Sequence, residues 1–304
     1  MRPLPGFPSA VHRYVGRVFT VVNRRVAEKI ARVPNSSEPS LDLTFIEQLT
    51  QYAGPRVVAP GWAVRIDVHY LGGLRHFRQW EVADIGLLLF ARQGRKTMAN
   101  KVALLQSKRL YPNNGAVVDE TLEDYLIGFG NLLPSSPLLP SVARPHFFHF
   151  TDQSKYQALR IDDEQYNAIA DYEDQQALPV HYLLYNPWTV PISYSYPVGA
   201  GRLKLGRKGN GGCRVLPSSA LRTALFGKPK NYSPTFNDVG GLVGKSKATW
   251  NGWRLEHFVS SLLMKCKEGQ LFDGLEQDNI HTLFNRRSGP IAAAVAVTVE
   301  QFGD

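Results

Sequence analysis

The chain has 304 residues, of which 43% are hydrophobic and 11% aromatic, and this apolar content excludes wholesale disorder. Its 35 Lys and Arg residues outnumber 26 Asp and Glu residues. The resulting formal net charge of +9 favours a polyanionic partner, most often nucleic acid. The sequence contains 2 cysteines, Cys213 and Cys266, which excludes a disulfide scaffold and a zinc module built from several cysteines.

We expect a cytoplasmic protein without membrane association. The longest uncharged apolar run, Ile291 to Val299, is far shorter than the roughly 20 residues needed to cross a bilayer. Arg17, Arg24 and Arg25 interrupt each stretch that could form the apolar core of a secretory signal peptide. The arginine-rich N-terminus leaves an organellar transit peptide open as an alternative.

The N-terminal segment 9–32 is predicted to form a helix, because apolar residues recur there at steps of three and four. The segment is rich in Lys and Arg and contains a single acid, Glu28. Two interpretations of its basic face stay open. The face is either simply solvated or in contact with phosphates.

A helix followed by three strands is predicted between residues 40 and 111. A loop rich in Pro, Asn and Ser precedes the helix, Ser40 or Asp42 can cap its start, and Gly54-Pro55 ends it. Apolar runs predict the strands, and segment 91–100 is expected to connect the last two. The predicted ranges are 41–53 for the helix and 63–71, 79–90 and 101–110 for the strands.

The rest of the chain is predicted to mix helices and strands without an internal repeat. Helices are expected over 119–129, 162–176, 217–226 and 250–266, and strands over 180–185, 192–196 and 291–299. A proline-rich crossing covers 134–145, and a loop of Gly, Lys and Arg covers 199–212. We expect one α/β domain, with a basic helix and linker in 1–39, the first part of the core in 40–130, and a completing α+β elaboration in 131–304.

A small polar set interrupts two of the apolar strands. Asp84 heads one strand, while Gln106 and Lys108 end the next and share one side, with Ser107 opposite. If the two strands form a hairpin, Asp84 lies opposite residues 106–108, within about 5 Å of its cross-strand neighbours. Asp and Lys side chains that face an interior are costly unless they are paired or bound to something.

These residue types suit phosphodiester hydrolysis, in which a divalent cation polarises the phosphate and lowers the pKa of a water. Mg²⁺ prefers oxygen ligands and commonly takes one or two carboxylates together with substrate oxygens and waters. Asp84 can supply a carboxylate, Gln106 a side-chain oxygen and Ser107 its backbone carbonyl. Lys108 can position the water or stabilise the developing charge.

The spacing of this set resembles that of a nuclease superfamily. Asp84, 21 residues and then Gln106-Ser107-Lys108 resemble the motif of the PD-(D/E)XK, or restriction-endonuclease-like, nucleases. The resemblance implies an αβββαβ core with a mixed central sheet and an Mg²⁺ or Mn²⁺ cofactor. It also implies a metal-ligating acid on the first helix, for which Glu47 is the candidate, with Glu81 as a second candidate. In this chain Ala83 replaces the Pro of the motif and Gln106 replaces its second acid.

The resemblance implies an endonuclease that acts on DNA in preference to RNA. Stretches 180–187 and 212–215 are similar to those of uncharacterised bacterial members. This similarity suggests an antiphage-defence effector that is held inactive until a partner protein or a signal releases it. Pairing of such nucleases suggests a homodimer by analogy. Two alternatives are a catalytically inactive subunit that binds nucleic acid or scaffolds a defence complex, and a mobile-element or recombination factor. Gln106 is the feature that favours the inactive subunit.

The candidate nucleic-acid contacts are basic residues near or after this motif. A mobile loop rich in Gly and basic residues can follow a phosphate backbone, although a solvated loop would have the same composition. The candidates are Arg109, Arg202, Lys204, Arg207 and Lys208.

Two other motifs give little support for a function. The segment Gly240 to Ser246 lacks the first glycine of a phosphate-binding P-loop, since Val239 stands at that position. His146 and His149 have the spacing of paired ligands on a helix, but the absence of nearby Cys or acidic residues favours structural histidines.

Overall fold

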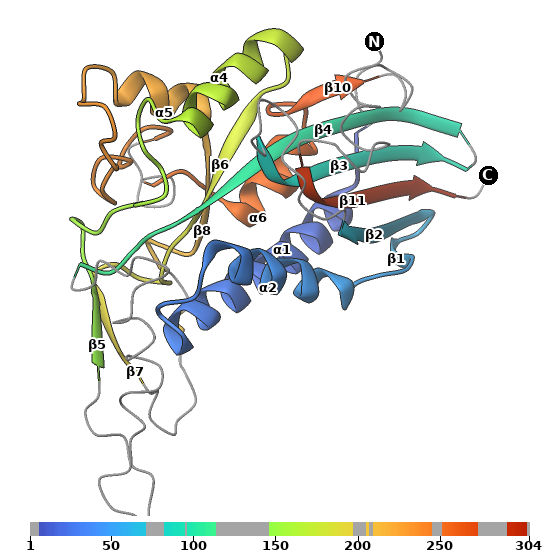
Figure 1. The fold of residues 1–304 in the computed structure, drawn as a ribbon. Helices are drawn as coiled ribbons and strands as arrows, with labels where there is room; N and C mark the ends of the chain where they lie inside the picture. The colour runs from blue at the N-terminus through green and yellow to red at the C-terminus, as the bar shows by residue number, and fades with distance from the viewer. Residues whose placement is uncertain are drawn as a thin grey trace, which may run out of the picture.

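The computed structural model describes residues 6–70, 82–94, 96–113, 146–196, 205–206, 209–244, 251–272 and 291–302. A nine-stranded mixed sheet crosses the molecule in the order β1-β2-β11-β3-β4-β6-β8-β9, and β10 pairs with β4 (Figure 1). The strands of this sheet are β1 (Arg56–Ala59), β2 (Trp62–Tyr70), β3 (Ala83–Gln93), β4 (Lys96–Arg109), β6 (Val180–Tyr185), β8 (Cys213–Pro217), β9 (Trp253–Arg254), β10 (Gln270–Phe272) and β11 (Ile291–Gln301). The chain is therefore of the α/β class, as predicted.

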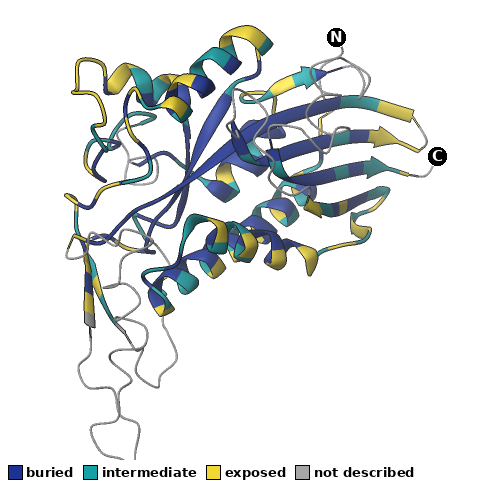
Figure 2. Cartoon of the chain, viewed as in Figure 1, coloured by how far each residue is buried: buried dark blue, intermediate teal, exposed yellow. Residues whose placement is uncertain are grey.

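Helices lie on both sides of the sheet. Helices α1 (Ser9–Arg32) and α2 (Glu38–Thr50) pack against each other along one face, and α6 (Leu255–His257) with the π-helical turn η2 (Phe258–Leu263) packs against α1. Helices α4 (Glu164–Gln176) and α5 (Ser218–Ala224) lie on the other side, near β6 and β8 (Figure 1). A separate ladder joins β5 (His146–Phe150) to β7 (Ile192–Tyr196). The central strands are buried along most of their length (Figure 2).

The N-terminal helix confirms the prediction from hydrophobic periodicity. It spans Ser9–Arg32 and buries an apolar stripe that includes Val11, Val15, Val22 and Val26. Helix α2, by contrast, begins at Glu38, three residues before the predicted start at Leu41. Pro39 fits the first helical turn, because that turn needs no backbone N–H from it. Asp42 is consequently inside the helix and is not its cap.

The predicted hairpin of β3 and β4 is present, with a shorter connection than expected. The two strands pair antiparallel, and Ile85 lies opposite Leu105. Strand β4 already begins at Lys96, and Gly94, with φ of 54°, lies in the tight turn. The prediction that 91–100 forms the connection was wrong, because the exposed polar ends of both strands have a loop-like composition.

The C-terminal strand lies in the middle of the sheet. The prediction of a final buried strand is confirmed, and β11 pairs parallel with β3 and antiparallel with β2. It separates β2 from β3, which are consecutive in the described chain. Its small residues Ala293, Ala294 and Ala296 are all buried between these neighbours.

The remaining predictions have mixed outcomes. The structure confirms the helix near 162–176, the strands near 180–185 and 192–196, and the short helix near 217–226. Segment 250–266 contains a short strand, α6 and η2 in place of one long helix, and the part before residue 251 is not described. His146 and His149 lie in strand β5 and not on a helix. The predictions for 119–129, 134–145 and 199–204 fall outside the described residues.

Across the described ranges, the helices are all too short or too polar to span a bilayer.

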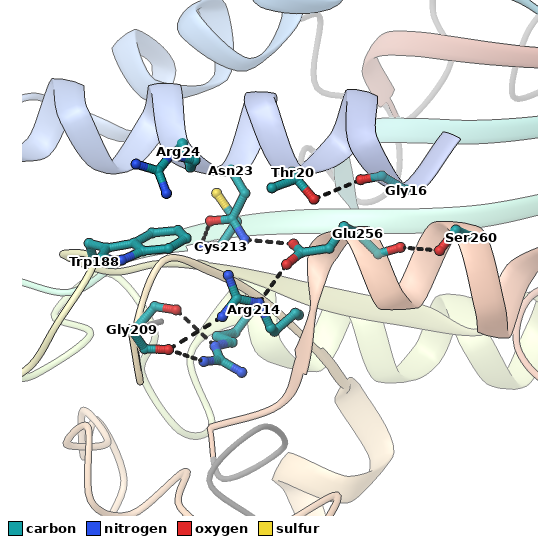
Figure 3. Close-up of polar contacts among 12 residues, drawn as sticks. Gly16, Thr20, Asn23, Arg24, Trp188, Gly209, Cys213, Arg214, Glu256 and Ser260 are labelled. Atoms are coloured by element: carbon teal, nitrogen blue, oxygen red, sulfur yellow. Dashed lines mark hydrogen bonds and ion pairs between the residues drawn. The ribbon is translucent and has the colours of Figure 1, made fainter. Parts of the chain in front are cut away.

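A buried polar network fastens α1 to α6 and β8 (Figure 3). The Nδ2 of Asn23 donates to Glu256 at 2.8 Å, and its Oδ1 accepts from the backbone N–H of Cys213 at 2.7 Å. The side chain of Arg214 is fully buried beside this network and donates to backbone carbonyls, including that of Gly211 at 2.9 Å. Burial of such polar groups is tolerated because their hydrogen bonds are made within the protein.

Substitution of Asn23 tests how much this network stabilises the fold. The variant Asn23→Ala leaves the buried N–H of Cys213 without its acceptor and removes the hydrogen bond to the Oε2 of Glu256, whose Oε1 keeps its contact with Arg254. We expect the free energy of unfolding, measured in urea, to fall by about 2 kcal/mol. The control Val21→Ala, at an exposed position of the same helix, should change it by less than about 0.5 kcal/mol. Equal losses in the two variants would contradict a structural role for the network.

Candidate active site

The candidate site lies where β4 continues beyond the start of β3. The pairing of the two strands is regular as far as Ile85 and Leu105. Beyond it, the backbone N–H of Ser107 donates to the Oδ2 of Asp84 at 2.7 Å. Two residues further along β4, the backbone N–H of Arg109 donates to the Oε1 of Glu38 at 2.9 Å. Two carboxylates therefore accept from β4 where a neighbouring strand would otherwise do so.

Asp84 meets the residues that the hairpin prediction placed opposite it. Its Oδ2 accepts from the Nε2 of Gln106 at 2.6 Å and from the hydroxyl of Ser107 at 2.8 Å, in addition to the backbone bond. Alternation along β4 predicted Gln106 and Lys108 on one side and Ser107 on the other. Asp84, at the very start of β3, contacts both Gln106 and Ser107 at the end of the ladder.

Lys108 is buried between two helices from opposite faces of the sheet. Its Nζ donates to the Oε1 of Gln165 on α4 at 2.8 Å and lies 3.7 Å from the Oε2 of Glu38 on α2. The residue is only 4% exposed, so these partners fix the position of the ammonium group. The salt bridge of Lys108 is thus with Glu38, a residue that the sequence analysis did not include.

The acids that α2 brings to this site are Glu38 and Asp42. They are four residues apart, so both lie on the side of the helix that faces β4. The predicted acid Glu47 does not join them, because its position on α2 is exposed. The early start of α2 explains this error, since Glu38 and Asp42 were assigned to the loop and the cap. Glu81, the other candidate, falls outside the described residues.

Asp42 is linked to Asp84 through a single hydroxyl group. The Oγ of Ser107 lies 2.9 Å from the Oδ2 of Asp42 and 2.8 Å from the Oδ2 of Asp84. Tyr185 donates its hydroxyl to the Oδ1 of Asp42 at 2.6 Å. One hydroxyl hydrogen can be donated to only one of the two carboxylates at a time, so Asp42 and Asp84 compete for it.

Burial raises the pKa of both acids that α2 brings to this site. Burial, followed by the neighbouring charge of Asp84, holds the pKa of Asp42 well above its ordinary value. Burial also raises the pKa of Glu38, although Lys108 opposes that shift. The three acids therefore share a confined space at a free-energy cost that is typical of functional sites.

The oxygen atoms of this cluster fit a hard divalent cation. The side-chain Oε1 of Gln106 is buried and has no hydrogen-bond partner in the described part of the chain. A buried carbonyl oxygen without a partner costs about 1–3 kcal/mol, and coordination of a cation would remove that cost. Asp84, Asp42 and this amide oxygen supply the ligand type that Mg²⁺ and Mn²⁺ prefer.

A pocket beside the cluster leaves room for a ligand. It has a volume of about 270 Å³ and is lined in part by Pro39, Asp42, Tyr70, Asp84 and Ala292. Over the described ranges, no three His, Cys, Asp or Glu side chains are arranged to hold a metal ion by themselves.

A larger pocket of about 480 Å³ lies elsewhere on the sheet. Arg65, Asp67, Arg92 and Glu300 contribute charges of both signs to its lining, and Arg65 and Asp67 form an ion pair at 2.8 Å. Its lining does not include Asp42 or Asp84, which line the smaller pocket. The smaller pocket is therefore the candidate ligand site.

The predicted nucleic-acid contact at Arg109 was wrong. Its guanidinium group is buried, donates to the carbonyl oxygens of Ser36 and Pro34, and lies 4.2 Å from the ring centroid of Tyr111. Arg109 points toward the α1–α2 connection, which hides it from a polyanion. The other candidates, Arg202, Lys204, Arg207 and Lys208, fall outside the described residues. The role of the Ser107 carbonyl as a metal ligand stays a prediction.

Comparisons with known proteins do not place the chain in a family. No protein-family model, no curated protein and no solved structure matches it.

Replacement of Asp42 tests whether its pKa is raised. A raised pKa means that the contribution of Asp42 to stability is full below the ordinary range of Asp and is lost as pH rises through the raised value. Asp42→Asn mimics the protonated acid. In urea titrations between pH 5 and 8, we expect the free energy of unfolding of the variant to depend less on pH than that of wild type. At pH 8 it should exceed the wild-type value by at least about 1 kcal/mol.

The control for this experiment is Glu47→Gln, which removes an exposed acid from the same helix. It should leave the pH dependence unchanged. If Asp42→Asn is less stable than wild type across this range, Asp42 is stabilising as a carboxylate and a raised pKa is contradicted.

Proposed function

We propose that this protein is a metal-dependent nuclease that hydrolyses phosphodiester bonds in DNA in preference to RNA. The observation that carries the proposal is the hydrogen bond between Asp84 and Gln106, whose buried Oε1 has no partner among the described residues. Lys108 joins this cluster through Glu38. The chain order α2, β2, β3, β4, α4, β6 also supports a restriction-endonuclease-like αβββαβ core. Strands β1 and β5 interrupt that order along the chain, and β11 lies between β2 and β3 in the sheet.

Each residue has a role in this proposal. Asp84 and Gln106 would hold a Mg²⁺ or Mn²⁺ ion, with Asp42 beside them. When bound, the ion would polarise the phosphate and lower the pKa of the attacking water. Ser107 fixes the Asp84 carboxylate through its N–H and hydroxyl. This support keeps the ligand in one orientation, as the partners of metal ligands commonly do.

Lys108 would supply the positive charge. Gln165 and Glu38 fix its ammonium group, so little reorganisation is needed to stabilise negative charge on the phosphate or to orient the water. The water oxygen then forms a bond to phosphorus and the bridging P–O bond breaks. A proton must leave the water, and a carboxylate of the cluster is a suitable acceptor.

The wider role rests on the resemblance alone. It favours an effector of bacterial antiphage defence that a partner or signal controls, with a homodimer as the active form by analogy. The alternative is an inactive subunit of the same fold. Gln106 favours this alternative, because it replaces an acid and its amide donates to Asp84, which reduces the negative charge available for a cation.

Cleavage of plasmid and single-stranded DNA with Mg²⁺ or Mn²⁺ tests the proposal. We expect Asp84→Asn and Lys108→Met each to lower the cleavage rate by at least about 100-fold, because each removes a charge that the transition state requires. Glu47→Gln is the matched control, since it removes an exposed acid of α2, and it should cut at the wild-type rate. Equal cutting by all four proteins would place the activity elsewhere or identify a contaminant.

Metal binding distinguishes the active enzyme from the inactive subunit. A ligand that binds only the folded state raises its stability, so Mn²⁺ should raise the melting temperature of wild type but not of Asp84→Asn. Gln106→Glu should strengthen this effect by adding a charged ligand. A wild type that binds DNA but neither responds to Mn²⁺ nor cuts would favour the inactive subunit.

A further inference from the structure

Arginine residues follow one side of α1 along almost its whole length. Arg13, Arg17, Arg25 and Arg32 are all exposed, whereas the opposite side of the helix is buried against the core. Their spacings keep them within one sector of the helix surface. Val21, between Arg17 and Arg25, is 40% exposed, so the outer side of the helix stays uncovered there (Figure 2). We call these four residues the arginine stripe.

Little negative charge accompanies the stripe. Arg25 lies 3.6 Å from Glu28, in an ion pair whose side chains are 54% and 32% exposed, which is worth little in water. Arg13 donates to the hydroxyl of Ser9 at 3.0 Å. Over the described ranges, Arg17 and Arg32 have no acidic partner.

The neighbouring Arg24 shows what a structural arginine on this helix does. Its guanidinium group lies over the ring of Trp188, 5.2 Å from the centroid (Figure 3). It also donates to the carbonyls of Leu205 and Gly206. Arg254 lies over the same ring at 5.0 Å. Arg24 thus contributes to packing, whereas the side chains of the stripe are exposed and available for a partner.

The dimensions of the stripe suit a nucleic-acid strand. At a rise of about 1.5 Å per residue, Arg13 and Arg32 are about 28 Å apart along the helix. This length corresponds to roughly eight nucleotides of one strand in a duplex, which rises about 3.4 Å per nucleotide. Arginine is also the side chain that binds phosphate through paired hydrogen bonds.

The stripe leads toward the candidate active site. Helix α1 ends at Arg32, and α2 begins six residues later at Glu38, the partner of Lys108. The buried Arg109 holds the connection between these helices through the carbonyls of Pro34 and Ser36. Helices α1 and α2 lie side by side (Figure 1). A strand that follows α1 would thus arrive at the α2 end where the acids and Lys108 meet.

We infer that the arginine stripe binds the phosphate backbone of the nucleic acid that the candidate site cuts, independently of base sequence. This inference rests on the proposed function and adds the surface along which the substrate lies. The basic face of α1 would then contact phosphates and would not be simply solvated. An acidic protein surface or an anionic membrane would also attract arginines. Binding to polyglutamate and to anionic vesicles distinguishes these partners from nucleic acid.

The test compares two triple variants with the same loss of charge. One is Arg13→Gln/Arg17→Gln/Arg32→Gln, and the control is Arg92→Gln/Lys96→Gln/Arg160→Gln, at exposed positions elsewhere. Both are made in the Lys108→Met background and measured in EDTA to prevent cleavage. Fluorescence anisotropy gives the affinity for a labelled 20-base-pair duplex across a series of salt concentrations.

We expect the stripe variant to bind the duplex more weakly. The plot of log affinity against log salt concentration should also become less steep, its slope falling in magnitude by about 2 to 3, roughly one for each lost phosphate contact. The control should keep the slope of the Lys108→Met parent. Unchanged melting temperatures would show that both variants fold, as expected for exposed positions.

Other results overturn the inference in distinguishable ways. If the parent binds duplex and the stripe variant keeps both its affinity and its slope, the stripe is not the surface along which the substrate lies, and the proposed nuclease is unaffected. If the parent binds neither duplex nor single strands at any salt concentration, the proposed function itself fails. Loss of binding to anionic vesicles or polyglutamate, with nucleic-acid binding intact, would assign the stripe to a membrane or a protein partner.

Discussion

The edge of β4 beyond Leu105 is the constraint on which the candidate site depends. Strand β3 starts too late to pair with the last residues of β4, and buried N–H groups must find acceptors. Asp84 and Glu38 provide them, from a strand and from a helix. These hydrogen bonds bring carboxylates from two separate elements to one point of the sheet. The ends of the elements thus place the functional side chains, while their middles form the core.

The same arrangement is costly for stability. Asp42, Asp84 and Glu38 share a buried region with one ammonium group, and the pKa values of Asp42 and Glu38 are raised as a result. A fold selected only for stability would replace several of these groups with apolar or neutral ones. Retention of the acids, and of a Gln106 oxygen that lacks a partner among the described residues, is easier to understand if a cation and a phosphate interact with them.

Local pairing could be predicted from the sequence, and distant pairing could not. The meeting of Asp84 with Gln106 follows from a short hairpin whose apolar pattern limits its register. The insertion of β11 beside β3 joins segments about two hundred residues apart, for which a single sequence carries no pairing signal. Glu38 and Asp42 were missed because Pro39 starts α2 earlier than its apolar stripe does. The burial of Arg109 was missed because composition does not distinguish a buried arginine from a solvated one.

The most direct test of the central claim is a crystal structure of the protein soaked with Mn²⁺, with anomalous scattering used to locate the metal. We predict an anomalous peak within coordination distance of an Asp84 carboxylate oxygen and the Oε1 of Gln106, about 2.0–2.3 Å away. The amide oxygen would then have the partner that it lacks within the described residues. A fully occupied peak elsewhere, or none beside these two residues at saturating Mn²⁺, would contradict the assignment of this cluster as a metal-dependent active site.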